Sequence, residues 1–519
     1  MRKLIKTLAL SILAVFSLSA SVYADVGDMG FFGGISEGRR LPKTTEDIIS
    51  KSSQKTGRKA KGQTGTFIYK EVVFLSGKPA VFEGLIDVAA NGGIQDDLDA
   101  GTYIQTFRVY PSAATTEEAS IERSMTLRVN YRKEYNQVIE DYAVESWSES
   151  IQAGGASFTL DRRLSDFGAS VIKDKTPGVT YYRGDISTRS VYSSGGGSPE
   201  DGSSITVVEG ADSFYGYACA WSSSEAHRMD QTVSSGDWQM QVQVRPGVSV
   251  NKLLQYSRNE PSAMSFEGNY KEVIQNESGL KYDIFIAPHI YPDQKMSGGI
   301  SIPGRNAFEQ LTAPDMAFLK GHYAEEDIKK LFSMQILDGD PKYYQPHQAI
   351  TRGQFVTALS KAVKLPVEAQ KTARTSRKVD AHLIVFPDVT SQRPDYPYIM
   401  AAYRNGVAIG RDNGTFYADA PLERQEAVAA MIRSLGLANL GLDPTAMTPF
   451  TDDDEIGYWA RRELDAARRL GLLLPDESGR ARPVEFVSKA EAAAFLSRLV
   501  DYMRSGLSED YSKHIVNFG

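Results

Sequence analysis

The chain contains very little cysteine and histidine. Its 519 residues include one cysteine, Cys219, and six histidines. A single cysteine cannot form a disulfide within the chain, and its position excludes a lipid attached near the N-terminus. Between residues 66 and 308 only His227 and His289 occur, too far apart in sequence to indicate a metal site. The sequence therefore singles out no metal site, no cofactor motif and no catalytic residues.

A strong net charge and a second long apolar run are also lacking. The formal net charge is -7, which is small for 519 residues and does not favour a nucleic-acid partner. After the first 24 residues, no apolar run reaches the roughly 20 residues that a transmembrane helix requires. We therefore expect a mature chain without a transmembrane segment. Because hydrophobic cores stop growing beyond roughly 250 to 300 residues, we expect two large units.

The first 24 residues have the pattern of a secretory signal peptide. A basic start is followed by an apolar run from residue 8 to 18 and by a small-residue cleavage pattern that ends at Ala24. We expect residues 1–24 to be removed on export. Residues 25–65 are polar and rich in glycine, serine and lysine, which predicts a flexible leader.

Between residues 66 and 308, apolar and polar residues alternate with a period of two. Met125, Leu127 and Val129 alternate with polar neighbours, as residues of half-buried antiparallel strands do. Turn sequences recur between such stretches, for example at 91–93 and at Pro246-Gly247. The pattern predicts an all-β domain at 66–308 with a sandwich or barrel-like architecture.

From about residue 315 the hydrophobic period changes to that of amphipathic helices. Three segments share an aromatic residue, a helix, a glycine-containing turn, a cation and a second helix, in that order. The aromatic residue and the cation are 29, 28 and 30 residues apart in the three segments. We place the repeats at 315–365, 382–438 and 446–504, with a linker at 366–381 and a tail at 505–519. We expect the parts before and after about residue 310 to fold independently.

Each repeat places a cation at the start of its second helix. The capping-box pattern, present as Thr351 with Gln354, makes Arg352 the first helical residue, and Arg424 and Lys489 hold the same position in the other repeats. A cation there opposes the helix dipole at a cost of about 0.3 to 1 kcal/mol. Free backbone N–H groups together with a cation suit an anion, so this position predicts an anion site.

The Phe-Pro-Asp of 386–388, the Tyr-Trp-Ala of 458–460 and the Thr-Arg-Gly-Gln of 351–354 resemble motifs of the S-layer homology family. The resemblance covers about residues 315–504. It implies an all-α part in which three repeats form a pseudo-threefold helical bundle, with binding grooves between neighbours. It also implies a ligand, a secondary cell wall polymer attached to peptidoglycan, whose pyruvate ketals often supply anionic carboxylates. The chain would then be a secreted protein held at the cell wall, in the surface layer.

The resemblance carries a set of polymer-binding candidates onto this chain. They are the groove cation at Arg352, Arg424 and Lys489, the opening aspartate at Asp388 and Asp452, and the tryptophan position at Tyr323, Tyr396 and Trp459. An aromatic face suits stacking on a sugar ring, and a carboxylate can accept hydrogen bonds from sugar hydroxyls. The first repeat has Phe318 in place of the aspartate, and the second has Glu423 in place of the capping threonine. We therefore rank the grooves of Arg424 and Lys489 first.

For the β-rich region the sequence leaves two interpretations open. The first is a displayed structural or interaction domain, with other surface-layer proteins among its candidate partners. The alternative is a wall-anchored carbohydrate-binding module or glycan-active enzyme, because two carboxylates that meet in space need not be close in sequence. The sequence shows no catalytic constellation, which favours the first interpretation.

Overall fold

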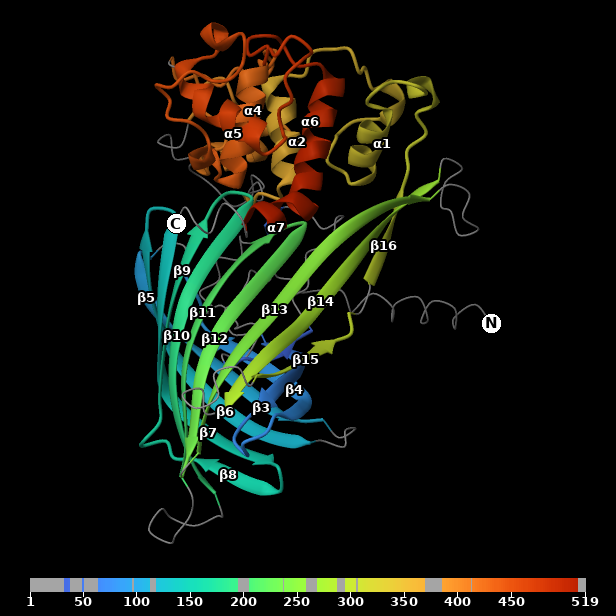
Figure 1. Ribbon diagram of the computed structural model, residues 1–519. Helices are drawn as coiled ribbons and strands as arrows, with labels where there is room; N and C mark the ends of the chain where they lie inside the picture. The colour runs from blue at the N-terminus through green and yellow to red at the C-terminus, as the bar shows by residue number, and fades with distance from the viewer. Residues whose placement is uncertain are drawn as a thin grey trace, which may run out of the picture.

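The computed structural model describes residues 32–37, 49–50, 64–95, 98–112, 118–194, 205–236, 238–257, 268–286, 295–304, 307–368, 385–411 and 413–511. As predicted, the N-terminal region is mostly β-strand and the C-terminal part is helical (Figure 1). The expected signal peptide at 1–24 lies outside the described residues. None of the described helices is long and apolar enough to cross a membrane.

The strands of the N-terminal region form one antiparallel sheet of 15 strands. Most strands pair with their neighbours in the chain, while β9 pairs with both β7 and β10. The strands are β1 (Ile35–Ser36), β3 (Thr64–Val73), β4 (Ala80–Asn91), β5 (Ala100–Pro111), β6 (Ala119–Glu134), β7 (Gln137–Ala153), β8 (Ala156–Leu160), β9 (Asp166–Lys175), β10 (Val179–Ser194), β11 (Ile205–Cys219), β12 (Ser222–Ser235), β13 (Trp238–Ser257), β14 (Asn269–Ile286), β15 (Lys295–Ile302) and β16 (Ala307–Thr312).

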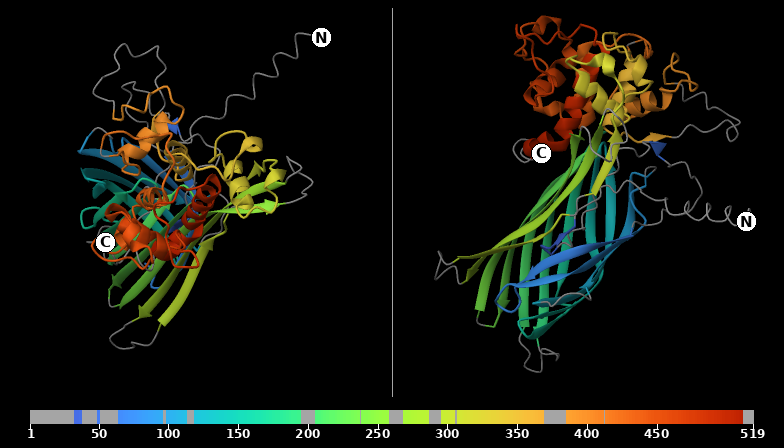
Figure 2. Two further views of the ribbon diagram at one scale, coloured as in Figure 1. Left: turned by 90° about the horizontal axis from the view of Figure 1, so that it is seen from above. Right: turned by 90° about the vertical axis from the view of Figure 1, so that its right-hand side faces the viewer.

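The sheet curves so strongly that its first strands lie across its later ones (Figure 2). Alternation produces the inner face: in β6 the odd-numbered positions from 121 to 131 are buried, and most positions between them are exposed. Ile35, Val72 and Phe74 from the first strands pack against Val242 and Leu280 from later strands. One sheet thus supplies both layers around the core.

The predicted turn at Pro246-Gly247 was wrong, because both residues lie inside the long strand β13. Pro246 pairs with Leu280 of β14, and Gly247 with Gly279. On the other side of β13, the pairing with β12 is interrupted between Gly247 and Val244. Proline has no N–H to donate, so it is tolerated where the ladder is broken. A local sequence does not reveal such an interruption.

Part of the expected flexible leader is packed into the sheet. Ile35 of β1 is fully buried, and the Phe32 ring lies 5.5 Å from that of Trp147. A Cβ on Gly34 would lie 2.1 Å from the Tyr69 hydroxyl, so the close approach requires glycine. The prediction of a leader was wrong for residues 32–37, because six residues are too few to show a hydrophobic period.

The C-terminal helices occur in pairs, one pair in each predicted repeat. They are α1 (Glu325–Ser333) and α2 (Arg352–Ala362), α3 (Tyr396–Arg404) and α4 (Arg424–Leu435), and α5 (Arg461–Arg469) and α6 (Lys489–Asp501). After α6 the chain continues through a π-helical turn at Tyr502–Gly506 into α7 (Leu507–Asp510). The expected tail at 505–519 therefore begins as a packed helix. In the expected linker, β17 (Val367–Glu368) pairs in parallel with β2 (Ile49–Ser50).

The two parts of the chain share a hydrophobic core. Tyr217 and Trp221 from one end of the sheet are buried in the same apolar cluster as Leu359, Leu435 and Met503 from the helices. The helices sit over this end of the sheet, with α7 between them and the strands (Figure 1). This shared core differs from the independent folding that we expected, because the change of hydrophobic period marks a change of structure and not a gap between cores.

Candidate functional site

The second helices of the three repeats begin side by side around a closed ring of backbone hydrogen bonds. The residue two positions before each cation takes part. Ile350 N donates to Val487 O at 2.9 Å, Val487 N to Leu422 O at 2.9 Å, and Leu422 N to Ile350 O at 3.1 Å. Each repeat thus donates to one neighbour and accepts from the other. This ring holds the starts of α2, α4 and α6 together.

The first backbone amides of these helices are not free, in contrast to our expectation. Arg352 N donates to Ala420 O at 3.0 Å, and Gly353 N donates to Ala418 O at 2.8 Å. The other two repeats use the same bonds: Arg424 N and Gln425 N donate to Glu485 O and Pro483 O, and Lys489 N and Ala490 N donate to Gln348 O and Pro346 O. Because carbonyls of the next repeat take these donors, an anion here must be bound by side chains.

Arg352 is buried, and each of its guanidinium nitrogens has a partner. Its Nε donates to Phe416 O at 2.9 Å, its Nη2 to Ile409 O at 3.0 Å, and its Nη1 pairs with the Glu426 carboxylate. Glu426 is the third residue of α4, so the cation of the first repeat is neutralised by the capping acid of the second. The geometry gives Arg352 a structural role between repeats.

Arg424 has fewer partners. Its Nη2 donates to Glu491 Oε1 at 2.5 Å, so the capping acid of the third repeat neutralises the cation of the second. Its buried Nε has no hydrogen-bond partner in the described part of the chain. In the third repeat, Ala481 is the equivalent of Phe416, because each donates its amide to the aspartate of its own repeat. The Phe416 carbonyl accepts from Arg352 Nε, whereas Arg424 Nε donates to no described residue.

Lys489 forms no ion pair with any described residue. The position that would supply its acid, the third residue of α2, is the neutral Gln354. Its Nζ donates to Gln348 Oε1 at 2.6 Å in an exposed contact. Burial lowers the pKa of the Lys489 ammonium. Among the three groove cations, this one has no carboxylate beside it.

Asp388 and Asp452 hold loops within their own repeats. Asp388 accepts from Phe416 N at 2.9 Å and from Tyr417 N at 2.6 Å. Asp452, which is buried, accepts from the equivalent amides of Ala481 and Arg482, both at 2.8 Å. These loops carry the carbonyls that bind the first amides of the neighbouring helix. The aspartates thus fix the loops that receive the start of the neighbouring helix.

The three aromatic candidates lie beside the second helix of the preceding repeat. Tyr323 is 70% exposed and Trp459 is 47% exposed, while Tyr396 is half-buried. Tyr323 lies beside Ser488, and burial raises the pKa of its hydroxyl. The Tyr344 hydroxyl donates to Lys489 O at 2.8 Å. The structure thus brings Tyr323 to the start of α6, where its ring stacks on His322 at 4.7 Å and the residue is otherwise largely exposed.

The acids that neutralise the cations were missed as groove residues. The sequence pattern assigned Gln354 and Glu491 to the capping boxes, which are present: Gln354 N donates to Thr351 Oγ1 at 3.3 Å and Glu491 N to Ser488 Oγ at 3.2 Å. Glu491 and its equivalent Glu426 have a second role beside the cation of the previous repeat, and this role depends on contacts between repeats. The sequence does show that the third residue of the second helix is the amide Gln354 in the first repeat and an acid, Glu426 or Glu491, in the other two.

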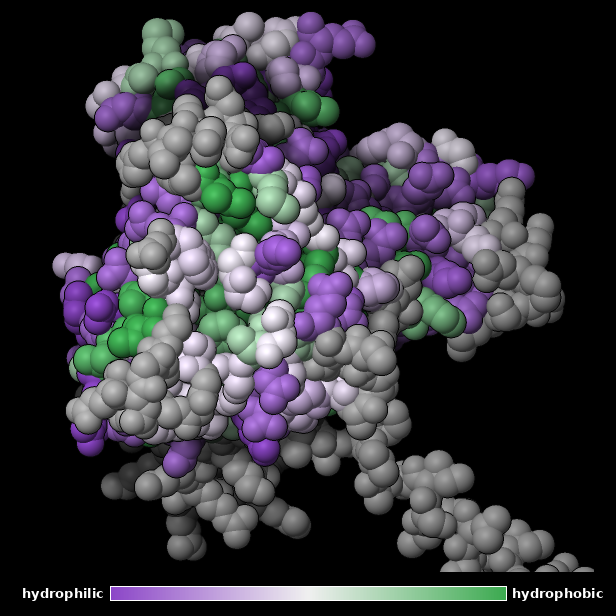
Figure 3. Space-filling view, turned by 60° about the horizontal axis from the view of Figure 1, so that its bottom comes forward, coloured by the Kyte–Doolittle hydropathy of each residue, from purple (hydrophilic) through white to green (hydrophobic). Residues whose placement is uncertain are grey.

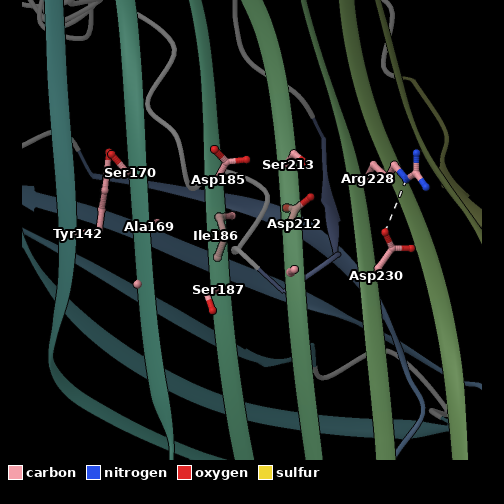
Figure 4. Close-up of a pocket in the computed structure, with 12 residues that line it drawn as sticks. Tyr142, Ala169, Ser170, Asp185, Ile186, Ser187, Asp212, Ser213, Arg228 and Asp230 are labelled. Carbon is pink, nitrogen blue, oxygen red and sulfur yellow. Dashed lines mark ion pairs between the residues drawn. The ribbon is translucent and has the colours of Figure 1, made fainter.

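The β-rich region offers a shallow depression of about 750 Å³ on β9 to β12 (Figure 4). Small polar side chains line it, with Asp185 and an ion pair between Arg228 and Asp230 at 3.6 Å. Among the described residues, no group of three or more His, Cys, Asp or Glu could hold a metal ion. On the face in Figure 3, hydrophobic side chains form separate patches among hydrophilic ones. Of the three aspartates in its lining, Asp230 is paired with Arg228, and Asp212 is buried and hydrogen-bonded to His227.

Comparisons with known proteins agree with the repeats. The model of the S-layer homology domain matches residues 319–356 and 385–428. An S-layer protein of Bacillus licheniformis is 29% identical over 178 residues, which are 34% of this chain and 18% of that protein. Exoglucanase XynX of Acetivibrio thermocellus is 25% identical over 185 residues, 35% of this chain and 16% of that protein. An amylopullulanase of Thermoanaerobacterium thermosulfurigenes is also 25% identical over 185 residues, 35% and 9% of the two chains.

The chain spans less than a fifth of the length of these relatives. The matched residues lie in the first and second predicted repeats and include Arg352 and Arg424, while Val487 of the ring and Lys489 lie in the third repeat. The chain therefore carries the S-layer homology domain at residues 319–356 and 385–428.

Proposed function

We propose that the helical part anchors the chain noncovalently at the bacterial cell surface by binding an anionic secondary cell wall polymer attached to peptidoglycan. The S-layer homology domain supports surface anchoring. In this proposal the three repeats form a pseudo-threefold bundle with a groove at each junction. The ring of hydrogen bonds through Ile350, Leu422 and Val487 supports that arrangement, because each repeat makes the same bond to the next.

The observation that carries the proposal is the charge balance at the three junctions. Glu426 and Glu491 neutralise the cations of the first and second repeats, and Gln354 leaves the cation of the third repeat uncompensated. A partly buried ammonium without a carboxylate is stabilised by a bound anion. We therefore place the main site at Lys489, with the exposed ring of Tyr323 beside it to stack on a sugar.

We place a second, weaker site at the junction of the second and third repeats. Arg424 supplies a guanidinium there whose ion pair within the described residues is with Glu491 alone, and Trp459 supplies an exposed aromatic side chain. The first junction lacks this capacity, because Arg352 is buried and each of its guanidinium nitrogens already has a partner. We again rank the grooves of Arg424 and Lys489 before that of Arg352. The reason is now the set of partners that each cation finds in the neighbouring repeat, and not the residue at 318.

The anchoring proposal is tested with the full mature chain and purified cell walls. The chain should sediment with walls that retain their anionic polymer and remain in solution with walls from which it has been stripped. Lys489→Gln should weaken binding about tenfold or more, because a charge-assisted contact is lost. Lys281→Gln is the matched control, since it makes the same charge change at an exposed position on the sheet. Equal binding to both wall preparations would exclude the polymer as the ligand.

For the β-rich region we propose a displayed structural or interaction role. The exoglucanase and the amylopullulanase are named for activities of whole proteins that this chain matches over about 35% of its own length. Among the described residues, no cleft favours an enzymatic role over a structural or interaction role.

A further inference from the structure

The helices that start at the groove cations all end at the sheet. We call the π-helical turn at Tyr502–Gly506 together with α7 the extension of α6. The last carbonyls of α2, α4 and this extension face one rim of the sheet, formed by the adjoining ends of β9 to β12 (Figure 1). The last four carbonyls of a helix have no partner within it, so a buried helix end needs donors from elsewhere. The rim of the sheet supplies them.

The end of α2 is completed by a tryptophan of the sheet. Trp221 Nε1 donates to Ala362 O, the last carbonyl of α2, at 2.7 Å. Trp221 is 1% exposed, so its indole N–H has no access to water and depends on this partner. The sheet thus meets the first repeat through one buried hydrogen bond and one large apolar surface.

The end of α4 is completed by β10 and the turn before it. The Tyr181 hydroxyl donates to Leu435 O at 3.0 Å, and Gly178 N donates to Ser434 O at 2.7 Å. A Cβ on Gly178 would lie 3.0 Å from Ser434 O and 2.9 Å from Val363, so glycine permits the close approach. The second repeat is therefore fitted closely to the rim.

The extension of α6 is completed by β12. Ser222 Oγ donates to Met503 O at 2.5 Å. Beyond α7, the Tyr511 ring stacks on Tyr181 with 5.5 Å between centroids, and its hydroxyl donates to Tyr182 O at 3.1 Å. The third repeat thus continues into the sheet, and a side-chain donor from the rim meets the end of each repeat.

A buried charge cluster also joins the bundle to the sheet. Lys252 of β13 is fully buried, and its Nζ lies 5.5 Å from the centre of the Trp221 ring and 3.3 Å from Glu272 of β14. Arg504, from the π-helical turn after α6, lies 4.7 Å from the same ring and 3.8 Å from Glu272. A carboxylate of the sheet is therefore shared by a cation of the sheet and a cation of the bundle.

We infer that this rim is a docking surface built for the base of the helical bundle, and that sheet and bundle form one cooperative unit. The inference does not depend on what the bundle binds. If the proposed function also holds, the polymer-binding end of the bundle faces away from the sheet, and the sheet extends from the wall in a fixed direction.

Hydrogen exchange in the full chain tests the docking surface. Trp221→Phe keeps most of the buried ring and removes the N–H. Amides in the last turn of α2 should then exchange about three- to tenfold faster, while those of α4 stay unchanged. Tyr181→Phe should produce the reverse pattern. Trp238→Phe is the matched control, because Trp238 begins β13 at the opposite end of the β12–β13 hairpin.

Thermal unfolding of the same proteins supplies the second measurement. Helical circular dichroism and tryptophan fluorescence should report one shared transition in the unaltered chain. The inference is overturned if the two signals melt at separate temperatures, or if neither substitution changes exchange at its own helix end. If Trp221→Phe does not fold, Tyr181→Phe and the milder Ser222→Ala decide the question at α4 and at the extension of α6.

Discussion

Arg352, Arg424 and Lys489 hold equivalent positions at helix starts, yet their surroundings give them different free energies in the charged form. Arg352 is buried against two carbonyls and a carboxylate, which offset both its desolvation and the unfavourable dipole. Lys489 lacks the carboxylate. Substitutions at the two positions should therefore separate folding from binding.

Arg352→Gln should lower the free energy of unfolding by about 2 kcal/mol, because it removes a buried ion pair and the donors to the Phe416 and Ile409 carbonyls. The cost is limited by Arg411, which also pairs with Glu426, at 3.0 Å. Urea unfolding of the full chain measures it. Arg352→Lys should recover little of the loss, since an ammonium cannot reach three acceptors. Unchanged stability in Arg352→Gln would contradict a structural role.

Gln354→Glu should supply the acid that the third junction lacks. We expect the new pair with Lys489 to add about 0.5 kcal/mol of stability, because it is partly exposed, and to lower wall affinity about tenfold. Thermal melting and wall sedimentation are measured on the same preparation. A variant that gains stability but binds walls as before would show that the anion does not sit at Lys489.

At the scale of elements, the hairpin of β11 and β12 contains a buried charged cluster. His227 Nδ1 lies 2.6 Å from Asp212 Oδ2, and its Nε2 lies 2.9 Å from Glu225 Oε1. Burial alone would disfavour the cation, but hydrogen bonds to the two carboxylates raise the pKa of His227 to about 9. The imidazolium therefore joins two strands inside the sheet.

This cluster predicts a pH dependence of stability. The folded pKa of about 9 exceeds the ordinary value of 6.5, so the stabilisation is complete below pH 6.5 and is lost as pH rises through 9. His227→Gln should be less stable at pH 6 and should show a flatter profile between pH 6.5 and 9. Urea unfolding across this range measures both. Equal slopes for the two proteins would contradict the assignment.

The sequence predicted elements well where one face is buried and the pattern is long. The alternation in β6 and the capping boxes of α2 and α6 are local, and both are confirmed. Pro246-Gly247 was misassigned because continuous pairing with β14 overrides the local turn preference. The engaged amides of Arg352 and its equivalents could not be predicted, because their acceptors lie in the next repeat about 60 to 140 residues away.

At the scale of the whole molecule, the change from one hydrophobic period to another correctly separated sheet from helices. It could not show that Trp221, Tyr181 and Ser222 complete the helix ends, since these residues read as ordinary strand positions. The outward location of the groove cations was equally hidden. The contacts at the helix ends and the location of the cations both result from the direction of α2, α4 and α6. All three helices run from the ring of hydrogen bonds to the sheet.

The common direction of these helices has a mechanical consequence. β13 has 20 residues, so the strands extend roughly 65 Å from the rim if fully stretched. A force on the far end of the sheet reaches the bundle through the covalent chain after β16 and also through the contacts at α2, α4 and the extension of α6. The tension is thereby divided among three helices, and under the proposed anchoring α4 and α6 pass it to the separate grooves of Arg424 and Lys489.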